Sequence, residues 1–456
     1  MIAFIKKYAL VFLFVYISLW TALASTPMNE VIAFPTIANQ LFSLLLYVPF
    51  LAVILWKLWS DVKSFKLHFV NVVYYLFAFY YVALSGYRLV AGMEVKESIY
   101  HAVTLLGSFA LFMQIYDGHY QISRENFSQN LLGIGVFMAV LKLIISFLEG
   151  GFFSLSPLNN LYSTSVLVML LPVLFAGFWE HKGVRGMLYW ATFSLSVLLI
   201  MICSSRAITL LSMGILGVLM LFTFRKVIDF GKFVAAVLCA ALLVGLMGIC
   251  NIGLVRRSLY REFGFRWPVS NSAVQNPDEE EMESPEMTDE ELMQSVIDAQ
   301  INTSDNMRGE LLQRGIREFK KSPVFGTGDL YYTYDMGYKT MEQTAHNFLV
   351  ECLVCYGMIG TLMIAALVLG MLIGCGLFRK FKWAELSNRI YLLLSMCHYF
   401  ALGCVQPSVF NTFLCPLFAL LLAYYGSQIL PERPARKSLS LFKGKAGKEL
   451  VNGTEE

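Results

Sequence analysis

Charged residues are scarce in this sequence. Only 15% of its 456 residues are Asp, Glu, Lys or Arg, whereas 57% are hydrophobic, and the mean hydropathy is +0.61. Soluble globular domains carry about 25% charged residues, so this composition excludes a chain built of two or three ordinary soluble domains. We therefore expect lipid to surround most of the chain.

Cysteine is absent from the longest polar segment, residues 256–345. All nine cysteines lie in or at the edges of apolar stretches, which excludes disulfide bonds within that segment. Cys352 and Cys355 form a C-x-x-C pair, but no second pair and no cluster of histidines accompanies them. Small buried thiols are therefore favoured over a metal or redox site.

Long apolar runs, in contrast, are abundant. A helix needs about 20 apolar residues to cross the hydrocarbon core of a bilayer. Twelve stretches meet this requirement, near residues 8–24, 41–58, 69–89, 99–116, 130–148, 161–179, 187–204, 206–224, 233–255, 353–378, 389–405 and 410–430. The apolar sequence that begins at His346 is too long for one upright span, so its first residues, up to Glu351, are placed at the outer rim. The sequence thus predicts an all-α polytopic membrane protein with about 12 transmembrane helices.

The distribution of Lys and Arg predicts which side of the membrane each connection faces. Lys and Arg concentrate in the N-terminal segment, in the even-numbered connections between the predicted spans and in the C-terminal tail. Because basic residues stay on the cytoplasmic side, both termini are predicted to be cytoplasmic. Residues 1–255 then hold nine helices, 256–345 form one large extracytoplasmic loop, 346–430 hold three helices, and 431–456 form a basic cytoplasmic tail. Residues 1–24 also resemble a signal peptide, so their retention is left open.

The predicted outer loop has a composition of its own. Residues 278–291 are acidic and contain no Lys or Arg, which is typical of a solvated excursion, and their role is left open. An amphipathic helix is predicted over 305–321, with Leu311 on its apolar face and Pro323 as its stop. Gly326-Thr327-Gly328 follows and indicates a turn, because the Lys-Ser/Thr of a nucleotide-binding loop is missing.

Three residues on the predicted outer face are candidates for chemistry. Arg206 lies in a very short connection between the seventh and eighth spans, although an interfacial arginine also snorkels to lipid headgroups. Arg308 lies in the predicted loop helix, and a guanidinium suits the capture of phosphate oxygens, with a solvated surface charge as the alternative. His346 is the natural general acid or base, with a structural histidine as the alternative.

The order and spacing of these residues resemble the O-antigen ligase and polymerase superfamily. The resemblance covers roughly residues 160–375, and the predicted helix count and topology also fit that superfamily. It rests on the long outer loop and on Ser205-Arg206, Arg308, Pro323-x-x-Gly326-x-Gly328, His346-Asn347, Glu351 and Gly357.

The resemblance implies a glycosyltransferase C-like helical fold in the bacterial cytoplasmic (inner) membrane. It implies that a glycan passes from undecaprenyl diphosphate to an acceptor hydroxyl on the outer face, without a metal, a nucleotide sugar or another cofactor. By this resemblance, Arg206 and Arg308 bind the diphosphate, and His346 orients or deprotonates the acceptor hydroxyl. The implied supporting residues are Ser205, Asn347 and Glu351.

Several functional alternatives stay open. A ligase moves a finished glycan onto a different acceptor, such as the core of lipopolysaccharide, whereas an O-antigen or capsular polysaccharide polymerase extends a lipid-linked repeat unit; the ligase is slightly favoured. A transporter or lipid flippase and a non-catalytic scaffold are alternatives from other classes. The expected partners are the lipid-linked glycan, an acceptor glycan or lipid, membrane lipids and envelope glycan-assembly proteins, with no nucleic acid. The sequence does not determine the sugar, the linkage, the acceptor or the oligomeric state.

Overall fold

The computed structural model describes the helical body of the chain and part of the predicted outer loop. The described residues are 7–24, 44–64, 68–92, 95–148, 161–203, 206–223, 227–249, 308–328, 332–335, 340–379, 385–404 and 411–429. The acidic segment 278–291 and the tail 431–456 lie outside these ranges, so what the sequence predicts for them stays a prediction.

Helices make up nearly all of the described chain, and each of the twelve predicted spans overlaps one of them. They are α2 (Ala9–Ala24), α5 (Val48–Ser64), α6 (Phe69–Val90), α7 (Lys96–Tyr116), α8 (Arg124–Leu148), α9 (Leu161–Glu180), α10 (Gly183–Met201), α11 (Arg206–Thr223), α12 (Val227–Ile249), α15 (Phe348–Gly374), α16 (Leu386–Gly403) and α17 (Leu414–Ile429). Of the described helices, six are long and apolar enough to cross a membrane, namely α6, α7, α8, α9, α10 and α15. The predominantly helical fold is confirmed, and the count of twelve crossings stays a prediction.

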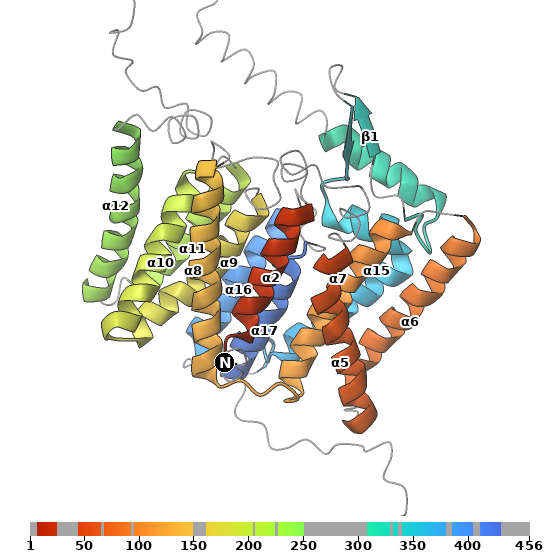
Figure 1. The fold of residues 1–456 in the computed structure, drawn as a ribbon, viewed down its shortest axis with the longest axis horizontal. Coiled ribbons are helices and arrows are strands. Elements are labelled where there is room, and N and C mark those ends of the chain that lie inside the picture. The colour runs from red at the N-terminus through yellow and green to blue at the C-terminus, as the bar shows by residue number, and fades with distance from the viewer. Residues whose placement is uncertain are drawn as a thin grey trace, which may run out of the picture.

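The helices lie side by side as a bundle (Figure 1). Helix α9 packs against α8, α10 and α16, and α17 packs against α7 and α16. Nearly every described side chain of α9 and α17 is buried, whereas leucines such as Leu55 of α5 and Leu242 of α12 are exposed. An apolar core inside an apolar outer surface is what a bundle in lipid requires, because the surrounding solvent is hydrocarbon.

Helix α15 is broken in its first half. Gly357 has φ +63° and ψ −172°, which is not helical, so the axis bends between the turns before and after it. This break explains why an apolar stretch too long for one upright span fits the fold. Glu351 is only 1% exposed, so the protein itself encloses it, and its place at the outer rim stays a prediction.

A small β-hairpin stands beside the helix of residues 308–321, at the top of Figure 1. Strand β1 (Tyr332–Asp335) pairs antiparallel with β2 (Thr340–Gln343), with Tyr332 opposite Gln343 and Asp335 opposite Thr340. The tyrosines and threonines of this segment favour extended structure, because β-branched and aromatic side chains pack well on a pleated surface. The all-α prediction did not include this hairpin.

Candidate functional site

Residues 308–321 form the helix that carries the candidate Arg308. Its Leu311 is fully buried and packs with Ala345 and Val350, so this helix is attached to the segment that holds His346. Leu311, on the predicted apolar face, is therefore buried, whereas Ile316 of the same helix is 39% exposed. The structure thus brings the Arg308 helix and the His346 segment together across more than thirty residues of sequence.

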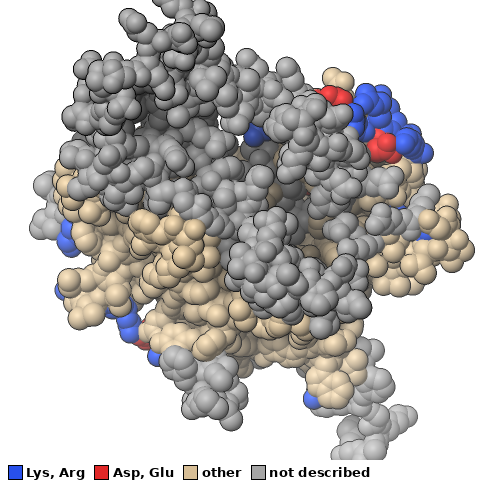
Figure 2. Space-filling view, turned by 45° about the horizontal axis from the view of Figure 1, so that its top comes forward, with Lys and Arg blue, Asp and Glu red and all other residues tan. Residues whose placement is uncertain are grey.

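The side chain of Arg308 is exposed at the start of the described part of this helix. Further along, Arg314 donates to Glu310 at 3.0 Å, an i,i+4 pair of the kind that stabilises an exposed helix. Arg308 has no ion pair with any other described residue. Figure 2 shows basic side chains, with a few acidic ones, gathered at the upper right where this helix lies. Arg308 is therefore available to an anion, and Arg317, which is exposed on the same helix, is available as well.

His346 adopts a backbone conformation that is uncommon for a residue with a side chain. Its φ is +51°, and it is the only residue other than glycine with a positive φ among the described residues. Its backbone N–H points to the Thr344 hydroxyl at 3.4 Å, and its side chain is half-buried. Strained backbone of this kind persists where surrounding contacts enforce it, and such positions cluster at functional sites.

Asn347 begins helix α15 directly after His346. Its Oδ1 accepts hydrogen bonds from the backbone N–H groups of Leu349 (3.1 Å) and Val350 (3.2 Å), which makes it the N-cap. Its Nδ2 donates to the carbonyl of Cys404 at the end of α16, 3.3 Å away. Asn347 therefore fixes the helix start that positions His346, and it ties this start to a second helix.

Glu351 lies one turn into α15, beneath the His346 turn. It is 1% exposed, and the Thr344 hydroxyl and the backbone of His346 are the polar groups nearest to its carboxyl group. Neither carboxyl oxygen has a hydrogen-bond partner among the described residues, and burial of a carboxyl group without hydrogen bonds is strongly unfavourable. Glu351 therefore lies next to the strained turn as an unsatisfied buried group, and it does not reach the exposed surface itself.

The turn after the 308–321 helix docks onto the break in α15. The N–H of Met358 donates to the Pro323 carbonyl at 2.9 Å, and the N–H of Gly328 donates to the Val354 carbonyl at 3.0 Å. A Cβ on Gly326 would lie 2.3 Å from the Val354 carbonyl oxygen, so this approach requires a glycine. The Pro-x-x-Gly-x-Gly pattern therefore forms a turn, as predicted, and it fixes the helix to α15.

Arg88 of α6 contacts both the turn after the 308–321 helix and the part of α15 before its break. Its Nη2 donates to the carbonyl of Phe325 in the turn (3.0 Å) and to that of Cys355 before the helix break (2.6 Å), and the residue is 1% exposed. Gly328 packs on the guanidinium, where a Cβ would be 3.0 Å from Nη1. Sequence reasoning missed Arg88, although a charged residue inside a predicted span is a signal of function or of a buried partner.

The structure places Arg206 only in part. Its backbone begins α11, and only four residues separate it from Met201 at the end of α10, so the connection is as short as the sequence predicted. The side chain of Arg206 and all of Ser205 lie outside the described residues. The distance from this guanidinium to Arg308 or His346 therefore stays a prediction.

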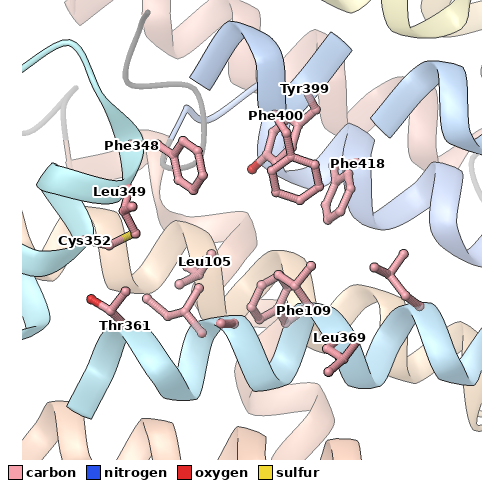
Figure 3. A pocket seen from close by; sticks show the side chains of 14 residues that line it. Leu105, Phe109, Phe348, Leu349, Cys352, Thr361, Leu369, Tyr399, Phe400 and Phe418 are labelled. Atoms are coloured by element: carbon pink, nitrogen blue, oxygen red, sulfur yellow. The ribbon is translucent and has the colours of Figure 1, made fainter. Parts of the chain in front are cut away.

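An apolar cavity of about 340 Å³ adjoins the start of α15. Both halves of the broken helix line it, together with α7, α16 and α17, as Figure 3 shows. The side chains on the α15 side begin with Phe348 and Leu349, and Phe109, Phe400 and Phe418 face them. A cavity lined almost entirely by hydrocarbon and aromatic groups is suited to an apolar chain.

The chain was compared with protein families and with curated proteins. No curated protein matches it. Residues 191–365 match the family model described as O-antigen ligase. The matched range runs from α10 into α15 and contains Arg206, Arg308 and His346, so the predicted resemblance is confirmed. The chain is therefore a helical membrane protein whose residues 191–365 match the O-antigen ligase family.

Proposed function

We propose that this protein is an O-antigen ligase-like glycosyltransferase, which moves a glycan from undecaprenyl diphosphate to an acceptor hydroxyl. The observation that carries the proposal is the contact of Leu311 with Ala345 and Val350, because it joins the arginine-bearing helix to the His346 turn within the matched domain. The protein would act at the outer face of the bacterial cytoplasmic membrane, with both termini in the cytoplasm, as the positive-inside rule predicts.

The proposed reaction forms a bond between the acceptor oxygen and the anomeric carbon while the bond from that carbon to the diphosphate oxygen breaks. Two electrons leave with undecaprenyl diphosphate, so negative charge grows on its oxygens. Arg308, together with Arg206, would stabilise this charge as it forms, since fixed guanidinium groups lower the energy of a charged leaving group. Attack opposite to the leaving group inverts the anomeric centre.

His346 is the proposed acceptor of the hydroxyl proton. A neutral imidazole is suited to this step, because its unprotonated ring nitrogen accepts the proton. The left-handed backbone of His346 and the cap formed by Asn347 would hold the ring in one orientation. Glu351 and Ser205 are proposed as supporting residues and not as groups that touch the substrate.

The apolar cavity beside Phe348 supports the proposed donor. Its lining is apolar, and it begins two residues after His346, so a polyprenyl chain lying there would leave its diphosphate near the His346 turn. The proposed reaction needs no metal or cofactor, because the arginines neutralise the leaving group and the imidazole takes the proton.

Transfer by the purified protein tests the proposal. The protein would be reconstituted in nanodiscs with a radiolabelled undecaprenyl-diphosphate glycan and candidate acceptors. Wild type would be compared with Arg206→Ala, Arg308→Ala and His346→Ala, and with Arg314→Ala as a matched control on the same helix. We expect the first three variants to lose at least about 100-fold in kcat, as for loss of a group that stabilises transition-state charge, and Arg314→Ala to keep its activity.

The products decide among the remaining functions. A single transferred glycan on a separate acceptor indicates a ligase, whereas a ladder of lipid-linked repeats indicates a polymerase of the same superfamily. Equal activity in Arg308→Ala, Arg314→Ala and wild type would remove the site assignment. If wild type transfers no glycan to any acceptor but moves the lipid across a vesicle membrane, the transporter or flippase function replaces this proposal.

A further inference from the structure

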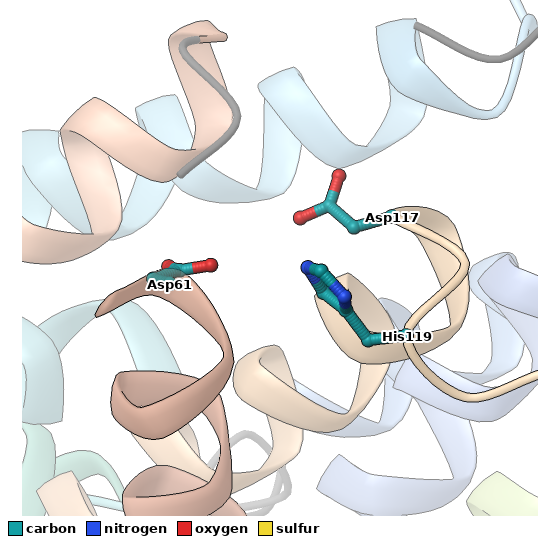
Figure 4. Close-up of side chains that lie close together, drawn as sticks. All are labelled: Asp61, Asp117 and His119. Carbon is teal, nitrogen blue, oxygen red and sulfur yellow. The ribbon is translucent and has the colours of Figure 1, made fainter. Parts of the chain in front are cut away.

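We propose that Asp61, Asp117 and His119 bind a divalent transition-metal ion. One carboxylate oxygen from each aspartate and one imidazole nitrogen lie within 4.8 Å of one another. Figure 4 shows the three side chains converging from the end of α5 and from the turn after α7. The site lies towards the lower end of α5 in Figure 1, away from the hairpin and from the residues proposed for glycan transfer.

The end of α7 explains why two of these side chains lie together. Asp117 is the C-cap residue, and its N–H donates to the Met113 carbonyl at 2.7 Å. Gly118 follows with φ +75°, a left-handed conformation that glycine adopts without strain and that commonly ends a helix. The N–H of Tyr120 then donates to the Gln114 carbonyl at 2.9 Å, which closes the reversal and returns His119 towards Asp117.

Neighbouring side chains orient the carboxylates. Oδ2 of Asp61 accepts hydrogen bonds from the Lys57 ammonium and from the Tyr75 hydroxyl (2.6 Å). Oδ1 of Asp117 accepts from Nε2 of His68 at 2.9 Å. In protein metal sites, groups outside the ligands hold the ligating carboxylates by hydrogen bonds of this kind. Each aspartate thus has one oxygen held by such a partner.

The other oxygen of Asp61 is the observation that points to a ligand. The Asp61 side chain is only 5% exposed, and its buried Oδ1 has no hydrogen-bond partner among the residues that the structure describes. Buried polar atoms are satisfied in nearly all cases, so an unsatisfied carboxylate oxygen inside a protein requires an explanation. A metal ion held between Asp61, Asp117 and His119 would coordinate this oxygen.

The charged groups of the cluster favour the binding of a cation. Nδ1 of His68 accepts a hydrogen bond from the Asn71 N–H at 3.3 Å, so its Nε2 faces Asp117 as the donor. The two aspartates share one lysine, Lys57, whose Nζ is 3.7 Å from Oδ2 of Asp117. Because the carboxylates outnumber this ammonium, a cation between them would be attracted.

The donor atoms select the class of metal. Mg²⁺ and Ca²⁺ prefer oxygen ligands alone, whereas an imidazole with two carboxylates suits Zn²⁺, Mn²⁺ or Co²⁺. Ligand atoms about 2.1 Å from a tetrahedral ion are roughly 3.4 Å apart, so the three atoms would close in by about 1 Å each or less. Such an ion would fasten the end of α7 to α5, where the Tyr120 ring already packs edge-on against Trp56.

Titration with Co²⁺ tests this site without any measurement of glycan transfer, so the two proposals fail independently. The full-length protein in nanodiscs would be treated with a chelator, dialysed and titrated with Co²⁺, whose visible absorption reports nitrogen and oxygen ligation, and Zn²⁺ would then compete. We expect one saturable site per chain. Asp61→Asn and His119→Gln should abolish the absorption band, and His68→Gln should weaken binding by about 10- to 100-fold.

The control is His181→Gln, since His181 stacks on Tyr189 outside the cluster and its loss should leave Co²⁺ binding unchanged. His119→Gln changes a half-buried turn residue, so it provides a test even if Asp61→Asn does not fold. Two results would overturn the proposal: wild type without a saturable band, or Asp61→Asn and His119→Gln with the wild-type affinity. The first would mean that the Lys57 ammonium already completes the cluster.

Discussion

Gly357 is the residue on which the attachment of the loop helix most depends. Its φ of +63° and ψ of −172° are accessible to glycine almost alone, so an alanine there would be strained by about 1–3 kcal/mol. The new Cβ would lie 2.1 Å from the Val324 carbonyl oxygen and 2.5 Å from the Phe325 nitrogen. Because both are backbone atoms, the turn would have to move away from α15.

That movement breaks two backbone hydrogen bonds, from Met358 to the Pro323 carbonyl and from Ile359 to the Val324 carbonyl. Each contributes about 0.5–1.5 kcal/mol, so Gly357→Ala should lower the free energy of unfolding by about 2–6 kcal/mol in total. The turn also holds the Arg308 helix, so glycan transfer should fall further than the loss of folded protein explains.

The assay compares Gly357→Ala with Gly214→Ala in nanodiscs. Gly214 lies in α11 with nothing within 4 Å of the added Cβ, and alanine in a helix is favoured over glycine by roughly 0.5–1 kcal/mol. Tryptophan fluorescence during heating measures the apparent stability, and transfer activity is then normalised to folded protein. If the two variants have the same stability and activity, the docking of the turn onto α15 does not matter for folding or function, and this reasoning is wrong.

Three further predictions concern the same attachment. Arg88→Lys keeps the charge but loses the planar group that reaches two carbonyls. Glycan transfer per folded molecule should therefore fall about tenfold, which corresponds to one hydrogen bond of roughly 1.4 kcal/mol. Unchanged transfer would contradict a positioning role for Arg88. Asn347→Ala removes the N-cap and should destabilise the protein by about 1 kcal/mol, while Asn347→Asp, which keeps the cap, should be close to wild type in a thermal unfolding assay. Leu311→Ala should release the loop helix and lower the free energy of unfolding by about 2 kcal/mol or more. Ile316→Ala, a control at a partly exposed position of the same helix, should change the free energy of unfolding by less than about 1 kcal/mol. Limited proteolysis follows the unfolding of both variants.

The sequence alone determined the helical membrane character of this protein and its resemblance to the O-antigen ligase family. Spans such as 69–89 and 161–179 correspond within one residue to α6 and α9, because a bilayer imposes a length and an apolar composition that are visible without any tertiary information. Arg308 and His346 were also predicted from the sequence as site residues, since their types and order are properties of the linear chain, and their roles stay predictions.

Tertiary structure decided which groups meet. Arg88 of α6 reaches carbonyls more than 230 residues away in sequence, and no local pattern encodes such a contact. Lys57, Asp61 and Asp117 each look like an expensive charge near the end of a span until packing brings them together. Glu351 was placed at the outer rim because a carboxyl group in lipid is unfavourable, and only the fold reveals that the protein encloses this side chain next to the His346 turn. The physical reason is common to all of these residues: hydrophobic periodicity reports whether a residue avoids water, whereas the partner of a buried charge depends on how the helices pack.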